Sequence, residues 1–202
     1  MSFDRLIARI DELKNPSVAG LDPKLEYVPR FLKDAFFVKD GHTLKAAAGA
    51  ILAFNKALID ELCDIVPAIK PQAAYYEMYG WEGVRTLAET IRYAQQKGMY
   101  VMTDGKRNDI GATMTAYATA HLGKVMVDGV ELEPFGADAL TVNGYLGTDG
   151  ISRCWMPARS MTRNLVWQRL RIPSSGELQD RKIDGKSVYE IWVKCAKSGE
   201  NR

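Results

Sequence analysis

Apolar residues along the chain alternate between short continuous runs and longer stretches with helical spacing. The short runs are typical of buried strands, and they cover residues 17–21, 66–70, 99–103 and 137–142. Between them, apolar residues recur every three or four positions, which predicts helices over residues 44–62, 84–94 and 110–123. Gly98 follows the second helical stretch as a C-terminal cap. Strands and helices in alternation predict a parallel sheet.

Polar residues gather where the predicted strands end. In a (β/α)8 barrel of the TIM type, the loops after the strands carry the active site, and this arrangement matches that face. The pattern therefore predicts an α/β fold of the (β/α)8 TIM-barrel type. A complete barrel takes about 250 residues. The chain has 202 residues and shows four strand patterns, so we expect an incomplete barrel that lacks its C-terminal strands.

Length and composition indicate one soluble globular domain over residues 1–202. The chain is 47% hydrophobic and carries a formal net charge of +2. Its first residues form an amphipathic helical stripe interrupted by charges, unlike the apolar core of a signal peptide, so we expect a cytoplasmic protein with no membrane partner. The three cysteines, Cys63, Cys154 and Cys195, lack the spacing of a metal site. The two histidines, His42 and His121, do not lie beside a Ser or Cys that could act as a nucleophile.

The densest group of charged residues follows the third predicted strand, in residues 103–113. If the strand continues to Lys106, side chains alternate faces, and Asp104 and Lys106 point the same way, about 6 to 7 Å apart. An ordinary solvated turn uses the same residue types, so this pair alone does not decide between a turn and a site.

The longer string Asp-x-Lys-x-x-Asp-Ile-x-x-Thr, which begins at Asp104, is more restrictive. It resembles the signature of the orotidine 5'-monophosphate decarboxylase family, in its bacterial, longer-chain subgroup. The resemblance recurs in the same order at Gly20–Pro23, Ile69–Gln72, Ala139–Asn143 and Pro173–Glu177. It covers residues 1–150 and 173–190. It implies a lyase of pyrimidine biosynthesis that converts orotidine 5'-phosphate to UMP and CO2, with no metal or organic cofactor.

The resemblance also implies a network of alternating charges made by Lys70, Asp104, Lys106 and Asp109. Loss of CO2 leaves a carbanion at C6 of the pyrimidine. Lys106 would stabilise this carbanion and then protonate it. Asp104 would face the substrate carboxylate, and Lys70 would position Asp104 and a ribose hydroxyl.

Asp109 lies beyond the third strand and need not share the face of Asp104 and Lys106. In the family, the matching aspartate and the residues matching Ile110 and Thr113 reach into the partner's pocket. The resemblance therefore implies a homodimer with shared active sites.

Further substrate contacts follow from the same resemblance. Asp22 matches the aspartate that holds the ribose hydroxyls, and Asn143 lies where a polar residue contacts the pyrimidine. Ser174, Ser175 and Gln179 match the loop that closes over base and phosphate.

Two segments, residues 151–172 and 191–202, depart from the family pattern. The first holds five arginines and two tryptophans but no Asp, Glu or Lys. Compensating reading-frame shifts followed by an early stop would produce such a pattern, and this is our hypothesis for its origin. A basic, stacking nucleic-acid surface is the alternative. The small net charge argues against it, so no nucleic-acid partner is expected.

Two other functions fit parts of the sequence. A sugar-phosphate aldolase-like synthase with a metal-bound enediolate is compatible with the Asp-x-Lys pair alone. A non-catalytic half-barrel would survive by self-association, because an incomplete barrel leaves sheet edges open. The continuation through Asp109 and Ile110, and the loop at Pro173–Glu177, favour the decarboxylase.

Overall fold

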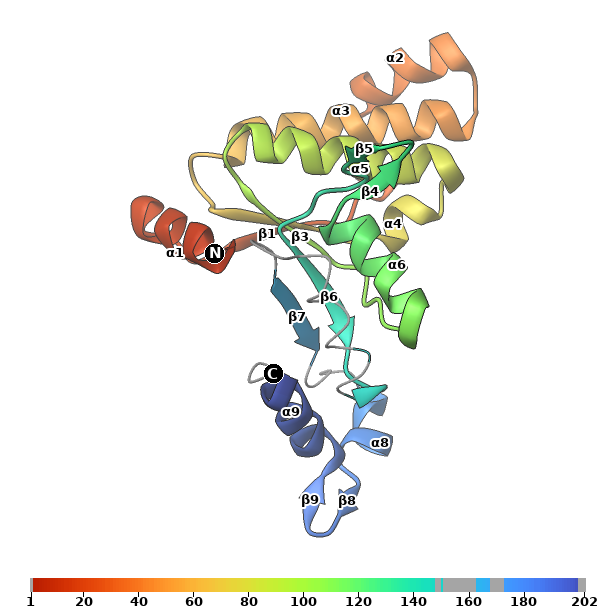
Figure 1. The fold of residues 1–202 in the computed structure, drawn as a ribbon. Helices are drawn as coiled ribbons and strands as arrows, with labels where there is room; N and C mark the ends of the chain where they lie inside the picture. The colour runs from red at the N-terminus through yellow and green to blue at the C-terminus, as the bar shows by residue number, and fades with distance from the viewer. Residues whose placement is uncertain (1, 148–149, 151–162, 168–172, 200–202) are drawn as a thin grey trace.

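A five-stranded parallel sheet forms the centre of the molecule (Figure 1). The structure, a computed structural model, describes residues 2–147, 150, 163–167 and 173–199. In spatial order the strands are β1 (Val18–Leu21), β2 (Ala68–Pro71), β3 (Tyr100–Thr103), β6 (Ala139–Asn143) and β7 (Arg163–Trp167). Every pairing is parallel, and each strand adds to the same side of its predecessor. This order is that of successive strands in a (β/α)8 barrel.

Helices connect the strands and cover one face of the sheet. They are α2 (Arg30–Asp40), α3 (Leu44–Leu62), α4 (Ala74–Glu77), α5 (Gly80–Gln96) and α6 (Gly111–Leu122), with the 3-10 turn η1 (Leu25–Tyr27) after β1. The main core lies between this layer and the outward side chains of the strands, and it includes Ile51, Ile59, Ile69 and Ile91. Burial of these side chains supplies the main driving force for folding.

The opposite face of the sheet holds a smaller apolar cluster. Ala68, Tyr100, Met102 and Ala139 point to this side, which is the barrel interior, and Leu6 packs against them. Leu6 belongs to α1 (Ser2–Leu13), so the N-terminal helix covers the amino end of the strands.

The helices and strands expected from apolar spacing are present. The helix predicted over residues 44–62 is α3, and Thr43 caps it, because the Thr43 hydroxyl accepts a hydrogen bond from the Ala46 amide at 3.1 Å. The helix predicted over residues 110–123 is α6, flanked by Ile110 and Gly123. Gly98 has a φ of +80° just after α5, as a C-terminal cap requires.

Sequence patterns gave four strands, and the structure adds a fifth, β7. It pairs with β6 over its whole length, from Ala139 opposite Arg163 to Asn143 opposite Trp167. This strand lies in the arginine-containing segment, residues 151–172, that departs from the family pattern. Backbone hydrogen bonds to an existing strand define it, and these bonds require no particular side chains. The remainder of residues 151–172 lies outside the described residues.

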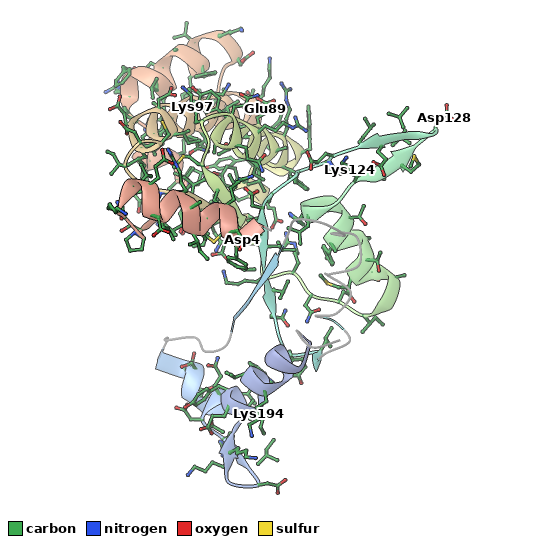
Figure 2. All side chains as sticks on the ribbon, turned by 60° about the vertical axis from the view of Figure 1, so that its left-hand side comes forward. Asp4, Glu89, Lys97, Lys124, Asp128 and Lys194 are labelled. Carbon is green, nitrogen blue, oxygen red and sulfur yellow. The ribbon has the colours of Figure 1, made fainter. Side chains whose placement is uncertain are left out.

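A hairpin of strands β4 (Val125–Val127) and β5 (Val130–Leu132) was also not predicted. Its turn is Asp128–Gly129, and both residues have positive φ values, of 47° and 80°. Asp-Gly between β-branched residues is a strong signal for such a turn. The hairpin projects away from the sheet, with Asp128 at its tip (Figure 2).

The last described segment forms a small module beyond the carboxyl ends of β6 and β7 (Figure 1). It contains η3 (Pro173–Ser175), α8 (Gly176–Gln179), β8 (Lys182–Ile183), β9 (Lys186–Ser187) and α9 (Val188–Gly199). The Trp192 ring of α9 packs edge-on against Tyr145, with centroids 6.1 Å apart. Among the described residues, none of the helices combines the length and the hydropathy that a membrane-spanning segment requires.

Candidate active site

Three neighbouring strands bring polar side chains together at their carboxyl ends. Lys70 lies in β2, Asp104 directly follows β3, and Thr141 lies in β6. The β2–β3 pairing extends one step past the strands, because Gln72 and Asp104 form a further parallel bridge. The Asp104 amide donates to the Pro71 carbonyl at 2.9 Å, which fixes where the carboxylate enters the site.

The Asp104 carboxylate is the centre of this cluster, with only 2% of the residue exposed. Its Oδ2 accepts hydrogen bonds from Lys70 Nζ at 2.7 Å and from Gln72 Nε2 at 3.0 Å. Its Oδ1 accepts from Lys106 Nζ at 2.7 Å and from Thr141 Oγ1 at 2.8 Å. A carboxylate offers about four lone-pair directions, and these donors satisfy them.

The charged donors keep this buried carboxylate ionised. Burial by itself raises the pKa of Asp104, because it disfavours the charged form. Hydrogen bonds from Lys106, Lys70 and Thr141 outweigh burial, so the pKa lies below its ordinary value of 3.8. At neutral pH the site therefore holds one carboxylate between two lysine side chains.

The two lysines remain accessible although the carboxylate between them is not. The side chain of Lys70 is 32% exposed and that of Lys106 is 39% exposed, against 3% for Asp104. Taken by itself, the group of Lys70, Asp104 and Lys106 has two positive side chains and one negative one, and its positive side chains are the accessible ones. Such an edge can bind an anion and stabilise negative charge that develops during a reaction.

Lys106 reaches Asp104 through a turn, which corrects the strand geometry expected from the sequence. The strand ends at Thr103, and Lys106 has a φ of +49°, in the left-handed region. This turn directs the Lys106 side chain back to the carboxylate, and its Nζ lies 2.7 Å from Oδ1. The two side chains share one site, but side-chain alternation along a strand is not the reason.

Arg107 attaches the same loop to three other elements. Its amide donates to the Thr141 carbonyl at 3.1 Å, and its guanidinium forms an ion pair with Glu77 of α4. The guanidinium carbon also lies 5.8 Å from the centroid of the Tyr117 ring in α6. These contacts give the loop after β3 a defined conformation.

Asp109, Ile110 and Thr113 lie around the start of α6 rather than in the Asp104 cluster. The Asp109 carboxylate accepts a hydrogen bond from the Ile110 amide at 2.7 Å. Ile110 is 69% exposed, and Thr113 is exposed as well. The structure thus places these three residues on an outer surface next to the site.

Asp22 and Asn143 lie at the carboxyl ends of β1 and β6. Asp22 directly follows β1 and is exposed. Asn143 is the last residue of β6, and its Nδ2 donates to the Lys106 carbonyl at 3.4 Å. Its Oδ1 accepts from the Tyr145 amide at 3.2 Å. Both residues border the same edge as Lys70 and Lys106.

Ser174, Ser175 and Gln179 belong to the C-terminal module, in η3 and α8. Ser174 is exposed and Gln179 is buried. The element α8 packs on η3 and α9, and the module lies beyond the end of β6 (Figure 1). A role for these three residues in closing the site stays a prediction.

Two residues that complete the Asp104 cluster, Gln72 and Thr141, were not selected from the sequence. Both lie in segments that resemble the family. Gln72 lies two positions after Lys70, and Thr141 lies two positions before Asn143. Side chains alternate faces along a strand, so each of these two pairs is expected on one face of the sheet. This signal was available for finding them. Within the described residues, no group of three or more His, Cys, Asp or Glu side chains could hold a metal ion.

Comparison with known proteins gives a consistent result. Residues 46–201 match the family model described as "Orotidine 5'-phosphate decarboxylase / HUMPS family". The orotidine 5'-phosphate decarboxylase of Rhodopirellula baltica is 40% identical over 187 residues, which are 92% of this chain and 60% of that protein. The one from Caldicellulosiruptor saccharolyticus is 32% identical over 189 residues, with 93% and 62% covered. The chain thus spans about 60% of the length of these curated relatives.

Solved structures give the same assignment. The OMP decarboxylase of Leishmania donovani superposes with a TM-score of 0.74 at 27% identity, covering 99% of this chain and 66% of that one. A putative orotidine 5'-phosphate decarboxylase from Streptomyces avermitilis gives a TM-score of 0.75 at 30% identity, with 96% and 62% covered. The predicted α/β fold of the (β/α)8 barrel type is confirmed, and the chain belongs to the orotidine 5'-phosphate decarboxylase / HUMPS family.

Proposed function

We propose that this chain acts in pyrimidine biosynthesis as a lyase that decarboxylates orotidine 5'-phosphate to UMP. The observation that carries the proposal is the buried Asp104 carboxylate with Lys70 and Lys106 ammonium groups at 2.7 Å on either side. The relatives of this chain are named as orotidine 5'-phosphate decarboxylases, so the comparisons do not favour the alternative of a sugar-phosphate synthase.

Charge stabilisation is the chemical problem in this reaction. The bond between C6 and the carboxylate carbon breaks, CO2 leaves, and the electron pair stays on C6. The Lys106 ammonium stabilises this pair and then transfers a proton to C6, which gives UMP. At about 4 Å and an effective dielectric constant near 20, one such charge pair contributes about 4 kcal/mol. Lys106 regains its proton from water.

Asp104 has two roles in this proposal. Its lowered pKa keeps it ionised, and its carboxylate holds Lys106 Nζ at 2.7 Å through a charge-assisted hydrogen bond until C6 takes the proton. Its negative charge lies beneath the accessible lysine side chains, and the repulsion that it exerts on the substrate carboxylate is relieved as CO2 leaves. Lys70 holds Asp104 from the other side and contacts a ribose hydroxyl.

Further residues would bind the substrate around this centre. The family resemblance assigns Asp22 to the ribose hydroxyls and Asn143 to the pyrimidine, and the positions of both residues at the accessible edge of the cluster are compatible with these roles. Ser174, Ser175 and Gln179 close over base and phosphate. Closure would exclude water from the site, and the binding energy of the phosphate would help to lower the free-energy barrier of the reaction. The reaction needs no metal or organic cofactor, and we place it in the cytoplasm as the work of a single domain, with no nucleic-acid partner.

The chain would work as a homodimer with shared sites. Asp109, Ile110 and Thr113 would enter the site of the partner subunit. This arrangement is what the family resemblance implies, and the exposure of Ile110 and Thr113 leaves both residues accessible to a second subunit.

The proposal is tested by incubating the purified chain with orotidine 5'-phosphate in the presence of a metal chelator. UMP and CO2 should form in equal amounts, and Lys106→Ala should abolish both. A sugar phosphate offered in parallel should remain unchanged. Absence of UMP from a folded chain would refute the proposed activity, and soluble aggregates without turnover would favour the non-catalytic half-barrel.

Shared sites are tested by mixing two inactive variants, Lys106→Ala and Asp109→Ala. A mixed dimer has one site with both defects and one site with neither, so random mixing should restore up to about a quarter of wild-type activity. Each variant alone is the control. No recovery after subunit exchange would show that each chain builds its own site.

A further inference from the structure

Lys106 adopts a backbone conformation that needs support. It is one of four non-glycine residues with positive φ within the described residues. The left-handed conformation costs an L-residue about 1 to 2 kcal/mol. Such a conformation persists where surrounding contacts determine it, and residues of this kind are found at functional sites. The contacts that hold Lys106 in this turn therefore also set the position of its ammonium group.

One side chain, Thr141, contacts both the turn and the carboxylate. Its hydroxyl donates to Asp104 Oδ1 at 2.8 Å and accepts from the Lys106 amide at 3.0 Å. Its main-chain carbonyl accepts from the Arg107 amide at 3.1 Å. Only 4% of Thr141 is exposed, so water does not readily replace these bonds.

The two bonds of the hydroxyl close a ring through the catalytic pair. From Thr141 Oγ1 the ring runs to Asp104 Oδ1, on to Lys106 Nζ at 2.7 Å, along the Lys106 side chain to its amide, and back to Oγ1. The Thr141 hydroxyl is therefore bonded directly to the backbone amide of Lys106 and, through Asp104, to its ammonium group.

If Thr141 had only a structural role, its side chain would need the right shape but not a hydroxyl group. β-Branched residues suit strands, and a buried Thr in β6 could serve only to fill space. Valine has the same shape and would fill that space equally well. The hydroxyl is the part that the structural explanation does not require.

We propose that Thr141 is a positioning residue that fixes the Lys106 ammonium over the reacting carbon by bridging Asp104 and the Lys106 backbone. Its catalytic consequence rests on the proposed decarboxylase function, whereas the bridge itself does not. The bridge acts on the placement of the proton donor rather than on substrate binding, so its loss should lower kcat and leave KM nearly unchanged.

Amide hydrogen exchange tests the bridge without any substrate. In Thr141→Val, the Lys106 amide loses its acceptor and should exchange at least about ten times faster, because about 1.4 kcal/mol corresponds to a factor of ten. The Arg107 amide bonds to the main-chain carbonyl of Thr141 and should keep its protection, which makes it an internal control. Thr141→Ser retains the hydroxyl and should preserve both. Unchanged exchange at Lys106 in Thr141→Val would overturn the proposal.

Kinetics test whether the bridge matters for turnover. Thr141→Val should lower kcat by roughly 10- to 100-fold with KM within about threefold of wild type, whereas Thr141→Ser should stay within about threefold in both. Should the valine variant not fold, Thr141→Ala removes the same hydroxyl and supports the same comparison. Faster Lys106 exchange with an unchanged kcat would overturn the positioning role. A wild-type chain without UMP formation would instead refute the proposed function, and amide exchange would still decide on the bridge.

Discussion

Two aspartates are buried at opposite ends of the same sheet, and they differ in the groups that surround them. Asp104, at the carboxyl end, meets two lysines, a glutamine and a threonine. Asp138, at the amino end, is 8% exposed. Its Oδ2 accepts from Arg5 Nη2 at 2.6 Å, the Val101 amide at 2.9 Å and Gln95 Nε2 at 3.4 Å.

The difference shows how one residue type serves stability in one place and chemistry in another. Arginine side chains are poor proton donors in proteins, so the contact between Arg5 and Asp138 can attach α1 to the sheet but does not serve proton transfer. A lysine ammonium can release its proton. Burial alone therefore does not mark a reactive aspartate; the partner groups and their access to solvent do.

Replacement of Lys106 should produce the largest effect on activity. Lys106→Ala removes both the charge beside C6 and the proton donor, and UMP formation should fall by about a thousandfold or more. Arg5→Ala, at the amino end, is the matched control and should leave turnover per folded molecule unchanged. Comparable losses in the two variants would break the distinction between the two ends.

The free energy of unfolding, measured as a function of pH, should show separate contributions from the two ends of the sheet. His121 lies close to the amino end, where its carbonyl accepts from the Ala137 amide and its ring stacks on Phe135 at 4.7 Å. Burial, assisted by the charge of Arg107, lowers the pKa of His121 from 6.5 to about 4. The unfolded chain then binds more protons than the folded chain between these values. The free energy of unfolding should fall as pH drops from 6.5 to about 4, by up to about 3 kcal/mol.

Asp104 should act in a lower window of the same titration. Its pKa is lowered in the folded state, so its contribution to stability is present above the ordinary value of 3.8 and is lost as pH falls further. Urea unfolding at a series of pH values measures both windows. His121→Phe should remove the upper one, and Asp104→Asn should weaken the lower one, to which Asp60 and Glu190 also contribute because their pKa values are lowered as well. A His121→Phe profile that matches wild type above pH 4 would contradict the assignment.

Replacement of Asp138 should reduce stability and spare activity. Asp138→Asn keeps the shape of the side chain but removes the charge that pairs with Arg5, whose side chain is half exposed. We expect a loss of about 1 to 2 kcal/mol in the free energy of unfolding, with UMP formation per folded molecule unchanged. Equilibrium urea unfolding and a turnover assay on the same sample measure both. A stable variant with impaired turnover would assign Asp138 to the site.

Apolar periodicity predicted much of the fold because burial follows from side-chain spacing. The helices α3, α5 and α6 and the strands β1, β2, β3 and β6 all appear where the pattern placed them. The fifth strand could not be predicted in this way, because its position depends on backbone pairing with β6. The hairpin could have been found from Asp128–Gly129.

The charged residues of the site could be predicted from the sequence, but much of their geometry could not. Asp104, Lys106 and Lys70 are identified by the strings that contain them. The left-handed turn at Lys106 could not be predicted from side-chain alternation, because it involves a hydrogen bond from the Lys106 amide to the Thr141 hydroxyl, 35 positions away in the chain. Gln72 and Thr141 are unremarkable polar residues in the sequence, and their importance follows from the carboxylate that they contact.

The buried Asp104 carboxylate with Lys70 and Lys106 on either side is the proposed decarboxylation centre. Release of labelled CO2 from carboxyl-labelled orotidine 5'-phosphate, compared between the wild-type chain and Asp104→Asn, tests it most directly. We expect the wild-type chain to release the label and Asp104→Asn to do so at least about a hundredfold more slowly while remaining folded. Equal rates in the two proteins would contradict the account.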